Sequence, residues 1–201
     1  MTTQASPLAL IILISTIIIS LYGLYKNRTL MENWMMHPWS VIYRKKWYLV
    51  FTSGFIHSDI PHLLFNMLTF YFFAFTLENT VGSINFAIIY FGSMVLADVT
   101  TILKQKDNPN YYALGASGGI SGILFSFILF YPETSIAILF IPIGIPAPIF
   151  GLLYLAYCYW AAKKSMGFIS HEAHFWGATA GLVLTVLLFP PVIPYFLERI
   201  L

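Results

Sequence analysis

The sequence predicts an all-α integral membrane protein in which six transmembrane helices form one bundle with a long interfacial first loop. Three observations support this fold class. Of the 201 residues, 59% are hydrophobic and only 9% are charged, whereas an ordinary soluble domain has about 25% charged residues. Six apolar segments are each long enough to cross a bilayer, which takes roughly 20 residues per helix. One further segment is both aromatic and basic, as is typical of the headgroup zone.

The six apolar segments are separated by short connections after the first loop, so residues 1–201 are predicted to form a single membrane domain. Backbone polar groups in lipid must be paired within the chain, which makes these segments helical. The first segment has no preceding Lys or Arg and no usual cleavage site, and we expect it to be retained rather than removed as a signal peptide. The expected helices cover residues 7–24, 60–79, 82–103, 113–131, 135–160 and 171–189.

The segment 25–58 differs in composition from the apolar segments. Trp34, Trp39 and Trp47 are interleaved with the basic residues 44–46. Tryptophan favours the membrane interface, and basic side chains bind lipid headgroups. We expect an interfacial loop with short helical pieces that lies on or partly in one leaflet, so membrane lipid is a predicted partner. The net charge of +2 is too small to indicate nucleic acid as a partner.

Polar residues gather near the starts of three expected helices that run in the same direction. Asn66, Ser117 and His174 each lie about one turn inside their helix, roughly 6–8 Å below its start at 1.5 Å per residue. Polar groups at membrane depth are costly and usually functional. An imidazole that takes the proton of a serine hydroxyl makes that serine a nucleophile. Asn66 and the Ser117 backbone N–H would stabilise the resulting oxyanion. Each residue taken alone is also compatible with an interhelical hydrogen bond.

The stretch GASGGISG, residues 115–122, contains Gly-x-Ser-Gly twice and therefore offers two candidate serines. Ser121 lies one turn, about 6 Å, deeper than Ser117. Because the levels of Asn66 and His174 match Ser117, we expect Ser117 to be the nucleophile and Ser121→Ala to keep most activity. Small residues let helix backbones approach closely, as a Ser–His hydrogen bond between two helices requires. The glycines in question are Gly115, Gly118, Gly119, Gly122, Gly177 and Gly181.

No third member of a catalytic triad is evident. Asp98 lies inside an expected helix, and Glu78 ends a helix on the far side of the bundle. Glu172 is next to the site but points away from the face of His174 at 100° per residue. We therefore expect a Ser–His dyad, with Asp98 and Glu78 as satisfied structural acids.

Three ordered motifs carry a resemblance to a known family. They are HSDIPHLLFN at 57–66, GASG at 115–118 and AHFWGATAG at 173–181. The sequence resembles the rhomboid intramembrane serine proteases, which carry His-x4-His-x3-Asn, Gly-x-Ser-Gly and Ala-His-x2-Gly-x3-Gly in this order. The resemblance extends over roughly residues 8–189 and is to the minimal six-helix, bacterial-type form.

The resemblance implies a hydrolase, a serine endopeptidase that cleaves transmembrane segments of membrane proteins without a cofactor. Ser117 would be the nucleophile and His174 the general base and then acid. His62 and Asn66 would line the oxyanion hole with the Ser117 N–H. The resemblance also implies a structural role for His57, which would hold the interfacial loop. Glu78 matches a far-side glutamate that ties helices together in relatives.

The expected helix over 135–160 has an unusual start, because Pro142, Pro146 and Pro148 lie in its first part. Proline suits a first helical turn, so the regular helix is predicted to start near Pro148. A weakened helix at this place fits the mobile gate proposed for the rhomboid family. Proline is also tolerated within membrane spans as a kink.

The sequence departs from the family at two places. Relatives often carry Trp-Arg in the first loop, where this chain has Tyr48 and Leu49. Relatives also tend to have an aromatic residue four positions after the serine, on which the histidine ring stacks. Here that residue is Ser121, which predicts a looser orientation of His174, and Ser121→Tyr or Ser121→Phe is expected to support His174 better.

A metal site is the alternative for the histidines. His171 lies three residues before His174 on nearly the same face, and His57 and His62 are within reach of the same end. We expect no metal, because no cysteine or inward carboxylate is expected to complete the site. The single cysteine, Cys158, lies in an apolar run and is expected to be a core residue.

The orientation of the bundle is where charge and resemblance disagree. Nine basic residues lie on the side of the expected site and one, Arg199, on the other. The positive-inside rule would place the site in the cytosol, whereas the resemblance implies a site that faces outward from a bacterial inner (plasma) membrane. We favour the outward orientation, because basic residues of an interfacial loop bind headgroups. The nine residues are Lys26, Arg28, Arg44, Lys45, Lys46, Lys104, Lys106, Lys163 and Lys164.

Two other function classes remain open from the sequence. An inactive rhomboid-like protein would bind membrane clients without cutting them, and it would typically lack the serine or the histidine that this chain has. A small transporter would use intramembrane polar residues as a pathway and would show inverted repeats, which the sequence does not show. The expected partners are transmembrane protein substrates, and the sequence leaves the oligomeric state open.

Overall fold

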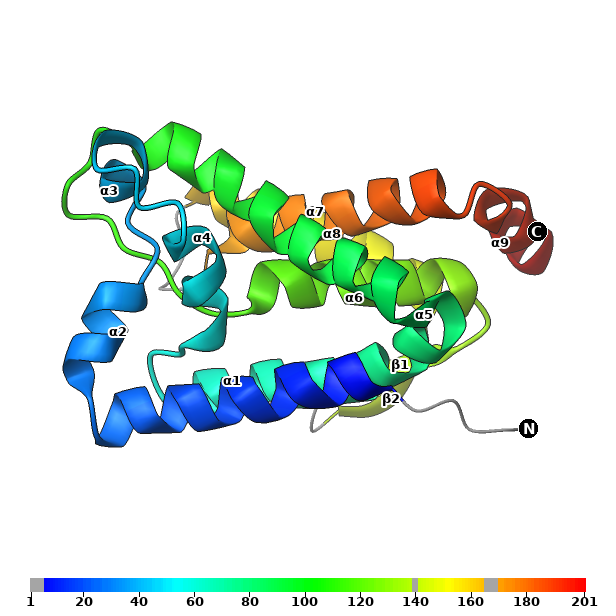
Figure 1. Cartoon of the computed structure of the whole chain (residues 1–201). Coiled ribbons are helices and arrows are strands. Elements are labelled where there is room, and N and C mark those ends of the chain that lie inside the picture. Colours follow the sequence, from blue (N-terminus) through cyan, green and yellow to red (C-terminus); the bar gives the residue numbers. More distant parts are fainter. Residues whose placement is uncertain (1–5, 139–140, 165–169) are drawn as a thin grey trace.

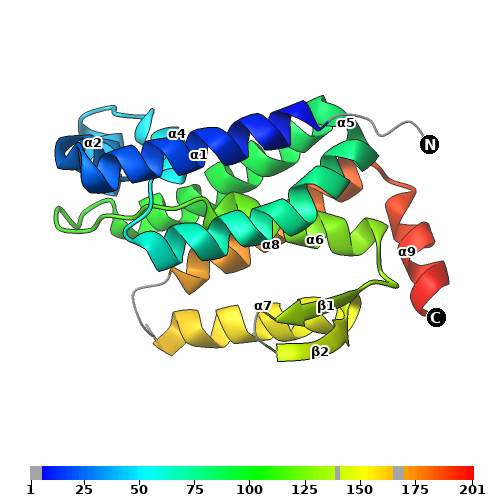
Figure 2. The same ribbon diagram turned by 90° about the horizontal axis from the view of Figure 1, so that it is seen from below.

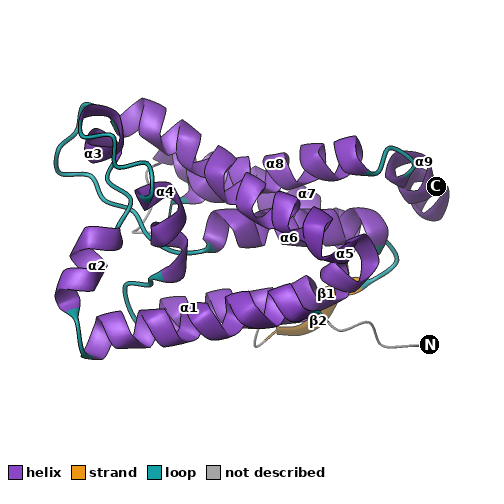
Figure 3. Cartoon of the chain, in the orientation of Figure 1, coloured by secondary structure: helices purple, strands orange, loops and turns teal. Residues whose placement is uncertain are grey.

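The protein is described here by a computed structural model that covers residues 6–138, 141–164 and 170–201. Helices make up most of the chain, and one small antiparallel hairpin lies beside them (Figures 1 and 3). The helices are α1 Pro7–Tyr25, α2 Arg28–Trp34, α3 Pro38–Tyr43, α4 Leu49–Thr52, α5 Ile60–Gln105, α6 Ser117–Phe130, α7 Ala147–Lys164, α8 His171–Leu188 and α9 Val192–Ile200, with a 3-10 turn η1 at Ser53–Phe55. The strands are β1 Ser135–Ile138 and β2 Ile141–Pro146.

The bundle has two distinct ends. The short helices α2, α3 and α4 gather at one end, which we call the mouth end, and the start of α1 and the C-terminus lie toward the other (Figure 1). The first half of α5, together with α6 and α8, starts at the mouth end, while α7 and the hairpin form one side of the molecule (Figure 2). The three parallel helices predicted to carry the polar residues therefore do start together.

Helix α5 contains two of the expected helices joined by a sharp bend. It extends from Ile60 to Gln105, but Gly82 is not helical: its φ of 77° is a left-handed conformation that favours glycine. The carboxylate of Glu78, one turn before the bend, accepts hydrogen bonds from the backbone N–H groups of Leu8 and Ala9 at 3.1 and 2.7 Å. These bonds cap the start of α1 and tie it to the bend, which confirms Glu78 as a satisfied structural acid.

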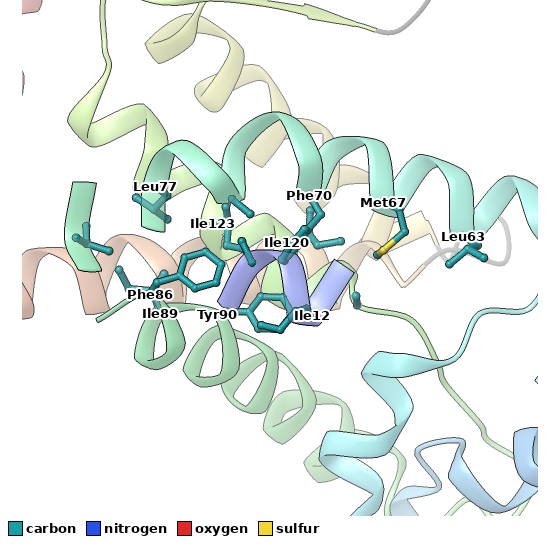
Figure 4. Packing of buried hydrophobic residues seen from close by; sticks show 14 residues of the cluster. Ile12, Leu63, Met67, Phe70, Leu77, Phe86, Ile89, Tyr90, Ile120 and Ile123 are labelled. Atoms are coloured by element: carbon teal, nitrogen blue, oxygen red, sulfur yellow. The ribbon is translucent and has the colours of Figure 1, made fainter. Parts of the chain in front are cut away.

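The main core lies where α1, α6 and both halves of α5 meet (Figure 4). Phe70, Phe86 and Ile123 are fully buried there, and Tyr90 is almost so. In contrast, large apolar side chains such as Leu152 are exposed on the outer surface, as expected of helices whose outer faces contact lipid. Because lipid is as apolar as leucine, such a core is stabilised in a bilayer by close packing rather than by removal from water.

The expected helix over 135–160 is wrong in its first part. Strands β1 and β2 pair there as an antiparallel hairpin in which Ser135 lies opposite Pro146. Pro142 and Pro146 have no backbone N–H to donate within a helix, and the segment is rich in β-branched isoleucine. The all-α prediction is corrected by this hairpin, while the prediction that the regular helix starts near Pro148 is confirmed by α7, which begins at Ala147.

The expected helix over 113–131 begins later than predicted. Ala113 pairs with Met36 through two backbone hydrogen bonds of 2.8 and 2.9 Å, and Gly115 has φ of 113°. Both features are incompatible with a helix, so α6 starts at Ser117 itself. Helix α9 was not expected; it follows Pro190 and Pro191, and its axis turns 112° from that of α8.

Segment 25–58 consists of short helices, as predicted for the first loop. His57 at its end is fully buried, and its Nδ1 lies 3.0 Å from Ser20 Oγ on α1. The Ser20 hydroxyl donates to the Phe55 carbonyl at 2.9 Å, so His57 Nδ1 is the donor to Ser20. His57 thereby attaches the loop to α1.

Within the described ranges, α1 and α5 are long and apolar enough to cross a membrane, and the bent pair α8–α9 is a third candidate. Helix α6 is apolar but only 14 residues long. The structure thus shows fewer long spans than the six transmembrane helices predicted from the sequence.

Candidate active site

Ser117 is the first residue of α6. The first hydrogen bond of this helix runs from the Ile120 N–H to the Ala116 carbonyl at 3.0 Å. The N–H groups of Ser117, Gly118 and Gly119 therefore have no acceptor within their own helix. Because the helix dipole is positive at this end, these donors form an environment that favours a developing negative charge next to the Ser117 hydroxyl.

Helices α6 and α8 are in direct backbone contact at two pairs of glycines. A Cβ added to Gly177 would overlap the Gly118 carbonyl, and one added to Gly181 would overlap the Gly122 carbonyl. The close approach predicted from the small residues is therefore confirmed. It brings Ser117, the neighbour of Gly118, next to the first turn of α8.

Two more of the predicted site residues, His62 and Asn66, lie close to Ser117 and pack against Gly115. At its φ of 113°, an added Cβ would lie 2.8 Å from His62 Cε1 and Nε2, and 3.8 Å from Asn66 Nδ2. The His62 ring and the Asn66 amide, both from α5, thus lie directly against Gly115, two positions before Ser117. Only glycine leaves room for this approach.

The hydrogen bonds around His62 indicate its tautomer. Its Nδ1 lies 3.1 Å from Ser58 Oγ, and the Ser58 hydroxyl donates to the Asp59 carboxylate at 2.7 Å. Ser58 has only one proton, so His62 Nδ1 carries the hydrogen that joins the two side chains. In the neutral ring, Nε2 is then an acceptor, and it becomes a donor only when the ring is protonated.

His174 lies one turn into α8 and faces an aromatic ring from α7. The ring of Tyr154 is nearly parallel to that of His174, at 14°, with centroids 6.4 Å apart. The Tyr154 and Ser121 hydroxyls are hydrogen-bonded at 2.8 Å. The aromatic residue that relatives place four positions after the serine is therefore replaced by Tyr154 from a neighbouring helix. No sequence pattern indicated this role, because spacing along one helix does not show which side chain another helix presents.

Ser117 and His174 are neighbours without being bonded to each other. No hydrogen bond links their side chains among the residues that the structure describes. The residues next to them in sequence are close, since a Cβ added to Gly118 would lie 3.8 Å from the Ala173 carbonyl oxygen. A cavity of about 30 Å³ is lined by Ser117 and Ala173, which is enough volume for a water molecule. Catalytic hydrogen bonds are commonly long in unliganded sites and tighten when substrate binds.

The acidic residues near the site do not complete a triad. Asp98 lines the same cavity, and its buried Oδ2 has no hydrogen-bond partner in the described part of the chain. The expectation that Asp98 is fully satisfied is therefore wrong. Glu172 forms an ion pair with Lys104 at 2.5 Å.

The structure places Cys158 beside two of the histidines. One ligand atom each from Cys158, His171 and His174 lie within 4.8 Å of one another. The expectation that no cysteine is close enough to complete a metal site is therefore wrong. The sequence does not indicate this cluster, because Cys158 is on α7 and both histidines are on α8, and the packing of the two helices cannot be read from spacing along either one.

The Rhomboid domain model matches residues 44–191. The rhomboid protease GlpG of Photorhabdus laumondii is 25% identical over 193 residues, which cover 92% of this chain and 63% of that protein. Rhomboid protein 1 of yeast mitochondria is 26% identical over 137 residues, covering 65% and 39%. A candidate rhomboid protease of Bacillus subtilis, YdcA, is 34% identical over 85 residues, covering 42% and 41%.

The alignments with these three relatives thus span less than two thirds of each relative's length. The domain match, in contrast, spans most of this chain and includes all four predicted site residues: His62, Asn66, Ser117 and His174. The apolar helices described above agree with a multi-pass integral membrane protein. The chain belongs to the rhomboid family.

Proposed function

We propose that this protein is an intramembrane serine endopeptidase that cleaves transmembrane segments of other membrane proteins. Ser117 is the nucleophile, and His174 is the general base and acid. The observation that carries the proposal is the glycine contact between α6 and α8. It puts a helix N-terminal serine beside the first turn of α8, where His174 lies, at the end where His62 and Asn66 converge on Gly115.

In the first half of the reaction, Ser117 Oγ attacks the carbonyl carbon of the scissile peptide while His174 accepts the hydroxyl proton. The carbonyl oxygen becomes an oxyanion beside the N-terminus of α6. The free Ser117 N–H and the Asn66 amide are the donors that stabilise it in the neutral site. His62 adds a third donor when Nε2 carries a proton.

In the second half, His174 returns the proton to the departing amine, and the amine-bearing fragment leaves. Water then attacks the acyl-serine ester, and His174 again takes a proton. The small cavity lined by Ser117 and Asp98 is suited to hold that water, because Asp98 Oδ2 is a free acceptor there. Collapse of the second tetrahedral intermediate releases the new carboxyl terminus and restores Ser117.

The membrane arrangement that goes with this function has six spans, with α5 contributing two and α1, α6, α7 and α8 one each. Helix α6 is short and largely enclosed by its neighbours, so it need not match the full bilayer thickness. We place the protein in a bacterial plasma membrane with the mouth end outward. A reporter fused after Leu201 tests the orientation, since activity of a cytosolic reporter requires the C-terminus to lie inside.

The decisive experiment measures cleavage of a fluorescent transmembrane substrate by the purified full-length protein in detergent. Ser117→Ala and His174→Ala are each expected to lower the rate by about 10⁴-fold or more. Ser121→Ala is the matched control, since it removes a second buried serine from the same helix face. Fluorophosphonate labelling of the wild type, lost in Ser117→Ala, identifies the nucleophile independently of any substrate choice.

Three outcomes would contradict the proposal. Cleavage that persists in Ser117→Ala would remove the nucleophile. Failure of the folded wild type to react with the fluorophosphonate and to cleave any of several substrates would favour a binding protein instead. Equal losses in Ser121→Ala and Ser117→Ala would mean that depth does not distinguish the two serines.

A further inference from the structure

We propose that Cys158, His171 and His174 form a binding site for a soft divalent cation of the Zn²⁺ type, and that occupancy of this site inhibits the protease. The binding claim rests on the geometry of the three side chains. The inhibitory claim rests on the function proposed above, because it requires His174 to be the catalytic base.

The three ligand atoms already lie close to the separation that a metal requires. They are within 4.8 Å of one another. A tetrahedral Zn²⁺ with bond lengths of about 2.0–2.3 Å holds its ligand atoms about 3.3–3.7 Å apart. The remaining difference of about 1 Å is within reach of side-chain rotation, with no movement of the helix backbones required.

His171 provides a second, independent indication of a ligand. Its side chain is 7% exposed, and its Nδ1 has no hydrogen-bond partner among the described residues. Buried polar atoms are nearly always paired. An imidazole with a buried, unpaired nitrogen is the kind of ligand that a metal ion satisfies.

The donor set selects the class of ion. One thiol and two imidazoles are soft to borderline ligands, which favour Zn²⁺ over Mg²⁺ or Ca²⁺. Binding replaces the thiol proton of Cys158 by the metal, because the thiolate is the ligand. Three protein ligands leave the fourth tetrahedral position to water.

The cluster lies toward the mouth end of α7 and α8. His171 is the first residue of α8, and α7 ends at Lys164 on the same side. His174 is only half-buried, so the cluster is not sealed inside the bundle.

Occupancy has two consequences for the reaction. A lone pair of His174 that is bonded to the metal cannot accept the Ser117 proton, so the nucleophile is not activated. In addition, the bond from Cys158 joins α7 to α8 and holds α7 against the site. Both effects slow turnover without any change to Ser117, His62 or Asn66.

The test titrates Co²⁺ into the full-length protein in detergent and records near-ultraviolet absorption. A Co²⁺–thiolate bond gives a charge-transfer band that imidazole alone does not give. We expect the band to saturate at one equivalent, to disappear in Cys158→Ser, and to require about 100-fold more Co²⁺ in His171→Asn. His37→Asn, a histidine outside the cluster, is the matched control and should leave the titration unchanged. Added Zn²⁺ should bleach the band by displacing Co²⁺.

The second arm measures substrate cleavage with and without Zn²⁺. Inhibition is expected for the wild type and His37→Asn, with at least about tenfold higher Zn²⁺ needed for Cys158→Ser and His171→Asn. Absence of the Co²⁺ band in the wild type, or its persistence in both Cys158→Ser and Cys158→Ala, would overturn the site. A band without any cleavage would leave the site standing and reject the protease, whereas cleavage that Zn²⁺ slows equally in all variants would reject the inhibitory role.

Discussion

Tyr154 is the residue whose role follows most directly from the structure and least from the sequence. Its ring faces His174, and its hydroxyl bonds Ser121. We predict that Tyr154→Leu, which removes the ring and the hydroxyl, lowers kcat for transmembrane substrates while KM changes little. Tyr154→Phe keeps the ring and removes only the hydrogen bond, so its effect should be smaller.

The size of each effect follows from the contacts. Aromatic pairs contribute about 0.5–1.5 kcal/mol beyond their buried area, and 1.36 kcal/mol corresponds to a factor of ten in rate. Loss of the ring should therefore lower kcat by about 2- to 13-fold. The Ser121 hydrogen bond is worth about 1 kcal/mol, but it acts on His174 only through the position of Tyr154. We expect a loss of about threefold or less for Tyr154→Phe and for Ser121→Ala.

The assay is a double-mutant cycle on steady-state cleavage rates. Ser121→Ala and Tyr154→Phe remove the same hydrogen bond, so the double variant should be no slower than the slower single one. Tyr159→Leu, on the same helix but half exposed and packed against Phe175, is the control and should keep its kcat. An unchanged kcat in Tyr154→Leu, or a larger loss in Ser121→Ala than in Tyr154→Leu, would refute the reasoning.

The structure also changes what is expected of an aromatic residue at position 121. Ser121 is 3% exposed and in contact with Tyr154, so a tyrosine placed there alone would collide with the ring that already supports His174. We now expect Ser121→Tyr to lower activity in the wild-type background. The exchanged pair, Ser121→Tyr with Tyr154→Ser, should be more active than Ser121→Tyr alone, because the site then again contains a single aromatic ring.

Three further predictions concern stability, measured by unfolding in detergent. Gly177→Ala should destabilise by about 1–3 kcal/mol, because the added Cβ meets the rigid Gly118 carbonyl; Gly151→Ala, whose Cβ would meet the flexible end of a side chain at 3.3 Å, should cost less. Glu78→Ala should cost about 1.5–3 kcal/mol, because it leaves the first N–H groups of α1 without their charged acceptor, and retention of wild-type stability would contradict that assignment. Burial lowers the pKa of His57 from 6.5 to about 3, so the unfolded chain binds a proton first as the pH falls. Stability should then drop by about 1.4 kcal/mol per pH unit below 6.5 until about pH 3, and His57→Gln should flatten that slope between pH 6.5 and 5.

Much of the site could be predicted from the sequence because it depends on distances along single helices. The common direction of their helices predicts that Ser117, His174 and Asn66 lie at one end of the bundle, and α6, α8 and the first half of α5 do start at the same end (Figure 2). The glycine contacts were predictable because a small side chain permits close approach whatever its partner is. The late start of α6 was not, since it depends on the pairing of Ala113 with Met36, a residue far away in the first loop.

The hairpin shows a different limit. Hydropathy over 135–160 is uniformly apolar, and an apolar run satisfies a helix and a buried strand equally well. The prolines favour a strand over a helix, but only for the part of the segment before Ala147. Proline excludes a helix interior locally and says nothing about the pairing of β1 with β2.

The two interactions of His174 that were missed come from the same helix, α7. Tyr154 and Cys158 are one turn apart on α7, so both lie on the face of α7 that approaches His174 on α8. They would have opposite effects on the reaction. The ring of Tyr154 would orient His174 toward its role, whereas a metal ion held by the Cys158 thiolate would bind His174 and prevent it from accepting the Ser117 proton. On the proposed mechanism, the position of α7 relative to α8 would determine whether His174 is available as the base. A cross-link that fixes α7 against α8 at their mouth-end parts should lower kcat even with Ser117, His62 and Asn66 intact, and an unchanged kcat in the cross-linked protein would show that α7 does not control the base.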